Sequence, residues 1–154
     1  MGVGTVTCRV LSGGWLHIAV NIGMLRAFGS ALEKAIGAKR LLLLYLLSGL
    51  GGALTHWAIY PSDVMPLIGA SGAISGLFGG VLMVMQRQGM LGDPKKYGKL
   101  ALFIAVWAGI SLFFGFAGMP GAGGAIAWTA HVGGFVGGML LFNILVREPV
   151  ELRP

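Results

Sequence analysis

Five apolar segments, each close to the length of a membrane-spanning helix, set the limits on how this chain can fold. They run over residues 15–33, 41–60, 66–86, 99–118 and 125–146. An α-helix needs about 20 apolar residues to cross a hydrocarbon core about 30 Å thick. Because lipid offers the backbone no hydrogen-bond partners, such a segment has to be helical. The sequence therefore predicts an all-α integral membrane protein, in which five transmembrane helices form one domain over residues 1–154.

The composition agrees with this prediction and argues against a soluble domain. Of the 154 residues, 56% are hydrophobic and only 10% are charged, whereas a soluble domain carries about 25% charged residues. The net charge of +6 does not indicate a nucleic-acid partner, because the basic residues lie between the apolar segments rather than on one polar surface. The lipid bilayer is the expected surrounding.

The basic residues are divided unevenly between the two ends of the predicted helices. If the spans alternate in direction, one side holds only Arg9, and Arg26 falls inside the first span. The other side holds Lys34, Lys39, Arg40, Arg87, Lys95, Lys96, Lys99, Arg147 and Arg153. Connections rich in lysine and arginine remain in the cytoplasm. We therefore expect the C-terminus in the cytoplasm and the N-terminus outside.

Four polar residues fall at similar depth in the outer half of this predicted bundle. Ser71 lies about one turn into the third span and His131 about two turns into the fifth. His17 and Asn21 share one face of the first span, because they are four residues apart. Each one alone is compatible with ordinary packing or with an interhelical hydrogen bond worth about 0.6 kcal/mol. A convergent set of polar groups in a membrane is a functional hypothesis, because burying them is costly.

The set also has the chemistry of acyl transfer. A serine hydroxyl is a weak nucleophile unless a base takes its proton, and a neutral imidazole can do so near pH 7. We therefore expect Ser71 Oγ and His131 Nε2 near hydrogen-bond distance. The tetrahedral intermediate needs hydrogen-bond donors, which Asn21, His17 and the backbone N–H of Ser71 offer. With no acidic residue at this depth, the arrangement is a dyad. His56 is expected at the membrane interface, without a chemical role.

Small residues recur at helical spacing on the third and fifth spans. The rows are Ser71, Ser75 and Gly79; Gly72, Gly76 and Gly80; Gly133 and Gly137; and Gly134 and Gly138. Small residues at this spacing let helix backbones approach closely. That approach would bring Ser71 toward His131, although ordinary helix packing explains the same pattern.

Three ordered motifs together resemble those of the rhomboid intramembrane serine proteases. Gly69-Ala70-Ser71-Gly72 looks like the GxSG nucleophile motif of the family. Ala130-His131-Val132-Gly133-Gly134, with Gly138, is similar to its histidine helix, and the segment from Gly14 to Asn21 is similar to its HxxxN segment. The resemblance covers roughly residues 13–146. It implies a rhomboid-like helical bundle with a water-filled cavity that opens to the outside.

The resemblance also implies roles for these residues. Ser71 would be the nucleophile, His131 the general base, and His17 and Asn21 the oxyanion donors. Gly69 would let its loop approach the fourth helix of the family core. Gly72, Gly134 and Gly138 would complete the motifs by close packing.

Substrates would be membrane proteins cleaved in or near a transmembrane helix, in a bacterial-type plasma membrane and without a cofactor or a metal ion. The family core has six spans, so the five predicted here correspond to a domain truncated at its N-terminus. The alternative is a catalytically impaired rhomboid-like protein that binds membrane clients without cleaving them. A transporter or channel is disfavoured, because no span carries an acidic group at mid-depth.

Overall fold

The computed structural model describes residues 14–62, 70–93, 97–117 and 128–148, and these residues contain helices and no strands. The helices are α2 (Gly14–Ile36), α3 (Ala38–Ile59), α4 (Ser71–Arg87), α5 (Gly98–Ala117) and α6 (Trp128–Leu145). Each coincides with one of the apolar segments, which confirms the predicted all-α fold and its five helices.

Three of the described helices, α3, α5 and α6, are long and apolar enough to cross a membrane by length and composition alone. The helix α4 has only 17 residues, because it begins at Ser71, whereas the predicted span begins at residue 66. Residues 63–69, which include Gly69, lie outside the described residues. The helix α2 extends to Ile36, three residues past the predicted end at residue 33.

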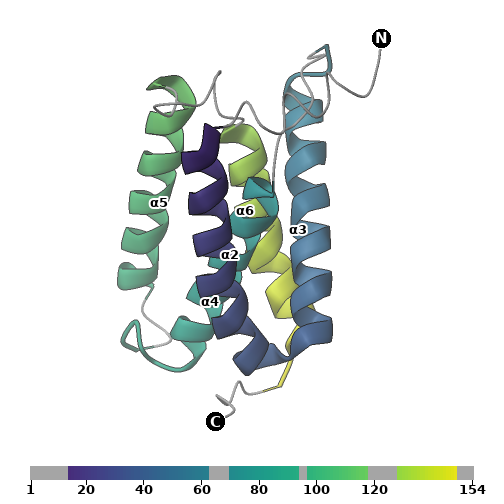
Figure 1. The fold of residues 1–154 in the computed structure, drawn as a ribbon. Coiled ribbons are helices and arrows are strands. Elements are labelled where there is room, and N and C mark those ends of the chain that lie inside the picture. The colour runs from purple at the N-terminus through teal and green to yellow at the C-terminus, as the bar shows by residue number, and fades with distance from the viewer. Residues whose placement is uncertain (1–13, 63–69, 94–96, 118–127, 149–154) are drawn as a thin grey trace.

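The helices alternate in direction, so that α2, α4 and α6 all begin toward the upper end of the bundle in Figure 1. A single residue, Gly37, joins α2 to α3, and its φ of 80° lies in the left-handed region that glycine adopts without strain. The helix α3 therefore returns to the upper end, where it finishes beside the start of α6 (Figure 1). The starts of α2, α4 and α6 and the end of α3 therefore all lie at the upper end of the bundle.

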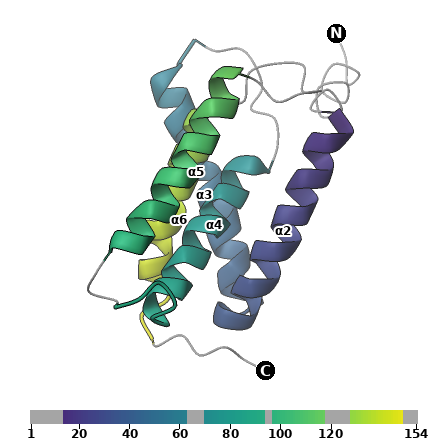
Figure 2. The ribbon, with the colours of Figure 1, turned by 90° about the vertical axis from the view of Figure 1, so that its left-hand side faces the viewer.

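The centre of the bundle is formed by α3, α4 and α6, which pack closely against one another. The helix α4 is buried on most of its circumference, and α2 and α5 lie on either side of it (Figure 2). One core cluster joins α2, α3, α4 and α6 around Leu32, Leu44, Leu77 and Phe142. A second cluster ties α5 to α4 and α6, where Trp107 stacks on Phe135 with the ring centroids 4.1 Å apart.

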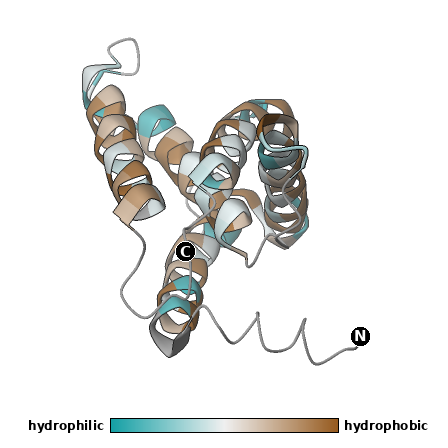
Figure 3. Cartoon of the chain, turned by 90° about the horizontal axis from the view of Figure 1, so that it is seen from above, coloured by the Kyte–Doolittle hydropathy of each residue, from teal (hydrophilic) through white to brown (hydrophobic). Residues whose placement is uncertain are grey.

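Large apolar side chains are exposed on the outward faces of the helices, as expected where lipid is the solvent. On α3 these include Leu42, Leu43, Leu46, Leu50 and Leu54. Figure 3 shows the same apolar character along most of the helices viewed from above. This exposure supports an integral membrane protein.

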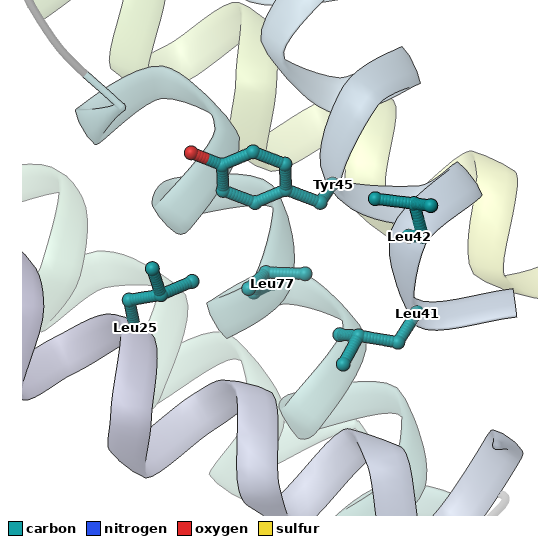
Figure 4. Close-up of a pocket in the computed structure, with 5 residues that line it drawn as sticks. All are labelled: Leu25, Leu41, Leu42, Tyr45 and Leu77. Carbon is teal, nitrogen blue, oxygen red and sulfur yellow. The ribbon is translucent and has the colours of Figure 1, made fainter. Parts of the chain in front are cut away.

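An apolar groove of about 290 Å³ lies between α2, α3 and α4. Figure 4 shows the residues that line it: Leu25, Leu41, Leu42, Tyr45 and Leu77. The lining is apolar apart from the Tyr45 hydroxyl, so the groove supplies no base and no group of hydrogen-bond donors. The candidate catalytic residues Ser71 and His131 lie elsewhere, at the starts of α4 and α6.

Candidate active site

Ser71 is the first residue of α4 and is partly exposed. The first hydrogen bond within this helix runs from the backbone N–H of Ile74 to the carbonyl oxygen of Ala70, at 2.8 Å. The N–H groups of Ser71, Gly72 and Ala73 precede that bond, so they have no partner inside the helix. The Ser71 hydroxyl thus lies at the positive end of a helix, beside backbone donors that have no partner within that helix.

His131 lies in the first turn of α6 and is also partly exposed. Its Nε2 atom is buried and has no hydrogen-bond partner within the described parts of the chain. A neutral imidazole can accept a proton only through a nitrogen that is not already engaged. The ring therefore presents a nitrogen that is shielded by the protein and not engaged by another described residue.

The backbones of α4 and α6 touch between these two residues. A Cβ atom added at Gly134 would overlap the carbonyl oxygen of Gly72, and one added at Gly72 would lie 3.2 Å from the carbonyl oxygen of Ala130. Ser71 directly precedes Gly72, and His131 directly follows Ala130. The two candidate catalytic residues therefore flank one close helix–helix contact.

The same contact continues one turn further along both helices. A Cβ atom at Gly138 would overlap the carbonyl oxygen of Gly76, and one at Gly79 would lie 2.8 Å from the carbonyl oxygen of Phe135. Gly137, in contrast, has nothing within 4 Å of such an atom. The row of Gly134 and Gly138 thus faces α4, whereas the expected row of Gly133 and Gly137 does not.

No hydrogen bond joins Ser71 to His131 in the described structure. The expected short contact between Oγ and Nε2 is therefore not formed here. Catalytic hydrogen bonds are often long in enzymes without substrate and tighten in the complex. The structure thus brings the starts of α4 and α6 into contact. A hydrogen bond between the side chains of Ser71 and His131 would require a further movement toward each other.

His17 and Asn21 form a unit of their own on α2. The Asn21 amide nitrogen lies 3.0 Å from His17 Nε2 and also donates to the His17 carbonyl oxygen at 3.0 Å. With Nε2 accepting, a neutral His17 carries its proton on Nδ1 and can donate from there. Among the described residues, neither side chain is hydrogen-bonded to α4 or α6. The structure therefore places both donors on the first turns of α2, and no hydrogen bond among the described residues joins either of them to Ser71.

His56 lies in the last turn of α3, near the end of the helix that was expected at the membrane interface, and its side chain is turned inward. Its ring Nδ1 lies 2.7 Å from the Thr129 hydroxyl oxygen, and both residues are buried. The bond connects the last turn of α3 to the first turn of α6. Sequence reasoning missed this pair, although two polar residues at the outer ends of apolar segments were the signal that could have found it.

No group of three or more histidine, cysteine or acidic side chains that could hold a metal ion occurs among the residues described. The candidate residues that the structure describes offer hydroxyl, imidazole, amide and backbone N–H groups. These groups suffice for nucleophilic attack, proton transfer and stabilisation of an oxyanion.

The chain is similar to known proteins over almost its whole length. The rhomboid domain matches residues 2–148. The chain is 31% identical over 144 residues to RHOMBOID-like protein 5 of Arabidopsis thaliana, covering 94% of this chain and 44% of that protein. It is 32% identical to the putative rhomboid protease YdcA of Bacillus subtilis, with 93% of this chain and 67% of that protein aligned.

A third relative, rhomboid protease GluP of Bacillus subtilis, is 35% identical over 134 residues, which is 86% of this chain and 24% of the relative. The chain thus spans less than half the length of two of these three relatives and about two thirds of the other. No solved structure was found to match it. The family match over almost the whole chain, together with the helical bundle, means that this chain belongs to the rhomboid family.

Proposed function

We propose that this protein is an intramembrane serine endopeptidase that cleaves membrane proteins in or near a transmembrane helix. The proposal is carried by the buried Nε2 of His131, which has no hydrogen-bond partner among the described residues. It lies across the close α4–α6 contact from the end of α4 that holds Ser71. A buried polar nitrogen without a partner is costly. In the substrate complex, the Ser71 hydroxyl would supply that partner by donating a hydrogen bond to Nε2 and then transferring its proton.

In the proposed reaction, Ser71 Oγ attacks the scissile carbonyl carbon while His131 Nε2 takes the hydroxyl proton. The resulting oxyanion is stabilised by the backbone N–H groups at the start of α4, which have no partner within the helix, and by His17 and Asn21. His131 then gives the proton to the leaving amine, and the peptide bond breaks. A water molecule, deprotonated by the same nitrogen, releases the acyl group and restores Ser71.

The substrate has to unwind around the scissile bond, because a helical peptide bond is hydrogen-bonded and shielded. Glycine and other helix-weakening residues near the cut should therefore favour cleavage, because they lower the cost of unwinding. We further propose that the chain lies in a bacterial-type plasma membrane, with its N-terminus outside and its C-terminus in the cytoplasm. The uneven distribution of lysine and arginine supports that orientation.

One observation favours the second candidate, a rhomboid-like protein that binds membrane clients without cutting them. His17 and Asn21 are engaged with each other, and the described side chains of Ser71 and His131 are not hydrogen-bonded together. If this resting arrangement persists with a client bound, the residues cannot act as a catalytic unit.

Reconstitution in liposomes separates the two candidates. A single-span membrane protein with a glycine-containing transmembrane helix is added, and its fragments are followed on gels. The protease proposal expects fragments with the wild type, none with Ser71→Ala, and fragments with Ser75→Ala, the matched control one turn further along the same helix. Crosslinking of the intact client to the wild type without any fragments would support the binding protein instead.

A further inference from the structure

The buried residues of α3 form a single stripe that ends at His56, opposite the first turn of α6. They are Leu44, Ser48, Gly52 and His56, spaced four residues apart. Residues at this spacing share one face of a helix. The stripe faces α4 and α6: Gly76 approaches Ser48, and the Ala130 carbonyl oxygen lies 2.5 Å from the position of a Cβ atom at Gly52. The upper part of α3 is therefore pressed against the first turn of α6.

The hydrogen bond between His56 and Thr129 closes this contact at its upper end. Its two atoms are 2.7 Å apart, and the two residues are 9% and 1% exposed. The Tyr60 ring packs against His56 at a tilt of 49°, with the ring centroids 5.4 Å apart. A bond shielded in this way has little water to replace it, so breaking it leaves a buried polar group unsatisfied.

Thr129 is two residues before His131 on α6. Successive residues of an α-helix are rotated by about 100°, so the two side chains project about 200° apart around the helix axis. Thr129 faces α3, and His131 consequently points away from that contact. The bond therefore fixes how the first turn of α6 is rotated about its axis and how far along that axis it lies relative to α3. It does so without contacting Ser71 Oγ or His131 Nε2.

We propose that His56 and Thr129 are positioning residues for His131. Their bond holds the imidazole at the rotation from which Nε2 can reach the Ser71 hydroxyl, in place of the carboxylate that orients the histidine in a catalytic triad. This inference rests on the proposed function, because it gives the pair a role in the same reaction. In this proposal α6 is positioned by two contacts: the His56–Thr129 bond to α3 and the glycine contact with α4.

The test compares Thr129→Val, which keeps the shape and removes the hydroxyl, with Thr129→Ser, which keeps the hydroxyl. A fluorophosphonate, which modifies an activated serine, titrates the active sites, and kcat and KM are then measured per titrated site on a reconstituted single-span substrate. We expect Thr129→Val to lower kcat by about tenfold or more with little change in KM, because small misplacements of catalytic groups are costly. Thr129→Ser should restore most of the loss.

Thr55→Val is the matched control, because the Thr55 hydroxyl bonds to the Gly51 carbonyl oxygen of its own helix at 2.8 Å. It should keep the wild-type kcat. A merely structural role for Thr129 would lower the number of titrated sites and leave kcat per site unchanged, which would overturn the inference. Loss of kcat in Thr129→Ser equal to that in Thr129→Val would also overturn it.

A second pair of variants keeps the inference testable if Thr129→Val does not fold. His56→Phe keeps a ring without the bonding nitrogen and should lower kcat as Thr129→Val does. Where both single variants fold, the double variant should be no worse than either, since both break one bond; additive losses would contradict the inference. Labelling that survives Ser71→Ala would overturn the proposed function itself. Labelling that is lost in Ser71→Ala, together with an unchanged kcat per titrated site in Thr129→Val and His56→Phe, would overturn the inference alone.

Discussion

The carbonyl oxygen of Gly72 in α4 occupies the space in which any side chain at Gly134 in α6 would have to begin. The two helix backbones are therefore in direct contact at the level of the candidate catalytic residues. No residue other than glycine can occupy position 134 without moving one helix relative to the other. The geometry of the proposed dyad thus depends on a contact that involves neither of its side chains.

Gly134→Ala should consequently separate α4 from α6. We expect it to lower the free energy of unfolding by about 1–3 kcal/mol, the usual cost of overpacking, and to reduce substrate cleavage. Denaturation in mixed detergent micelles measures the stability. Gly137→Ala is the matched control: nothing lies within 4 Å of its added Cβ atom, so it should be neutral or stabilising by up to about 1 kcal/mol through helix propensity. Equal destabilisation of both variants would contradict the close contact.

Asn21→Ala tests the role of the pair on α2. Removing an oxyanion donor lowers kcat by about a hundredfold or more, so the variant should show that loss with KM little changed, as measured on a reconstituted substrate. Asn143→Ala is the control, because this asparagine lies near the other end of the bundle and accepts a hydrogen bond from Arg87 at 2.9 Å. Wild-type kcat in Asn21→Ala would remove Asn21 from the proposed mechanism.

Arg87, at the end of α4, should stabilise the lower end of the bundle. Its guanidinium donates to the Val146 carbonyl oxygen at 2.5 Å and to Asn143, and it lies 5.0 Å from the centre of the Phe142 ring. Arg87→Gln should lower the free energy of unfolding by about 1–3 kcal/mol, because a charge-assisted bond to the end of α6 is lost. The exposed Arg147, changed to Gln, serves as the control and should leave stability within about 0.5 kcal/mol. Equal free energies of unfolding for the two variants would contradict a stabilising role for the Arg87 contacts.

The orientation in the membrane can be tested with fusions at the C-terminus. Green fluorescent protein folds to its fluorescent form in the cytoplasm, whereas alkaline phosphatase is active only outside it. Since the basic connections lie on the side of the C-terminus, we expect fluorescence from the first fusion and no activity from the second. Phosphatase activity without fluorescence would reverse the proposed orientation.

The apolar segments predicted the helices because lipid imposes the same requirement on every spanning backbone. The helix ends were less accessible to sequence reasoning. The helix α2 continues to Ile36 because Gly37 is the residue with the left-handed φ that reverses the chain. Hydropathy cannot reveal this, since a helix ends where backbone geometry changes and not where charge begins.

The candidate site was predicted in part. Chemical type and expected depth singled out Ser71, His131, His17 and Asn21 together, but neither specifies how a helix is rotated about its axis. The bond between His56 and Thr129 was missed for that reason: its partners are 73 residues apart in the chain, and only helix rotation brings them together. The sequence did show that Leu44, Ser48, Gly52 and His56 are spaced four residues apart and so share one face of a helix. It did not show which helix that face contacts.

The most direct test of the proposed dyad is the chemical identity of the modified residue. The protein in detergent micelles is treated with a fluorophosphonate, digested and analysed by mass spectrometry. We expect a single adduct on Ser71 in the wild type, and its loss in His131→Ala, because the hydroxyl is then no longer activated. An adduct on any other serine, or undiminished modification of Ser71 in His131→Ala, would contradict the assignment of Ser71 and His131 as nucleophile and base.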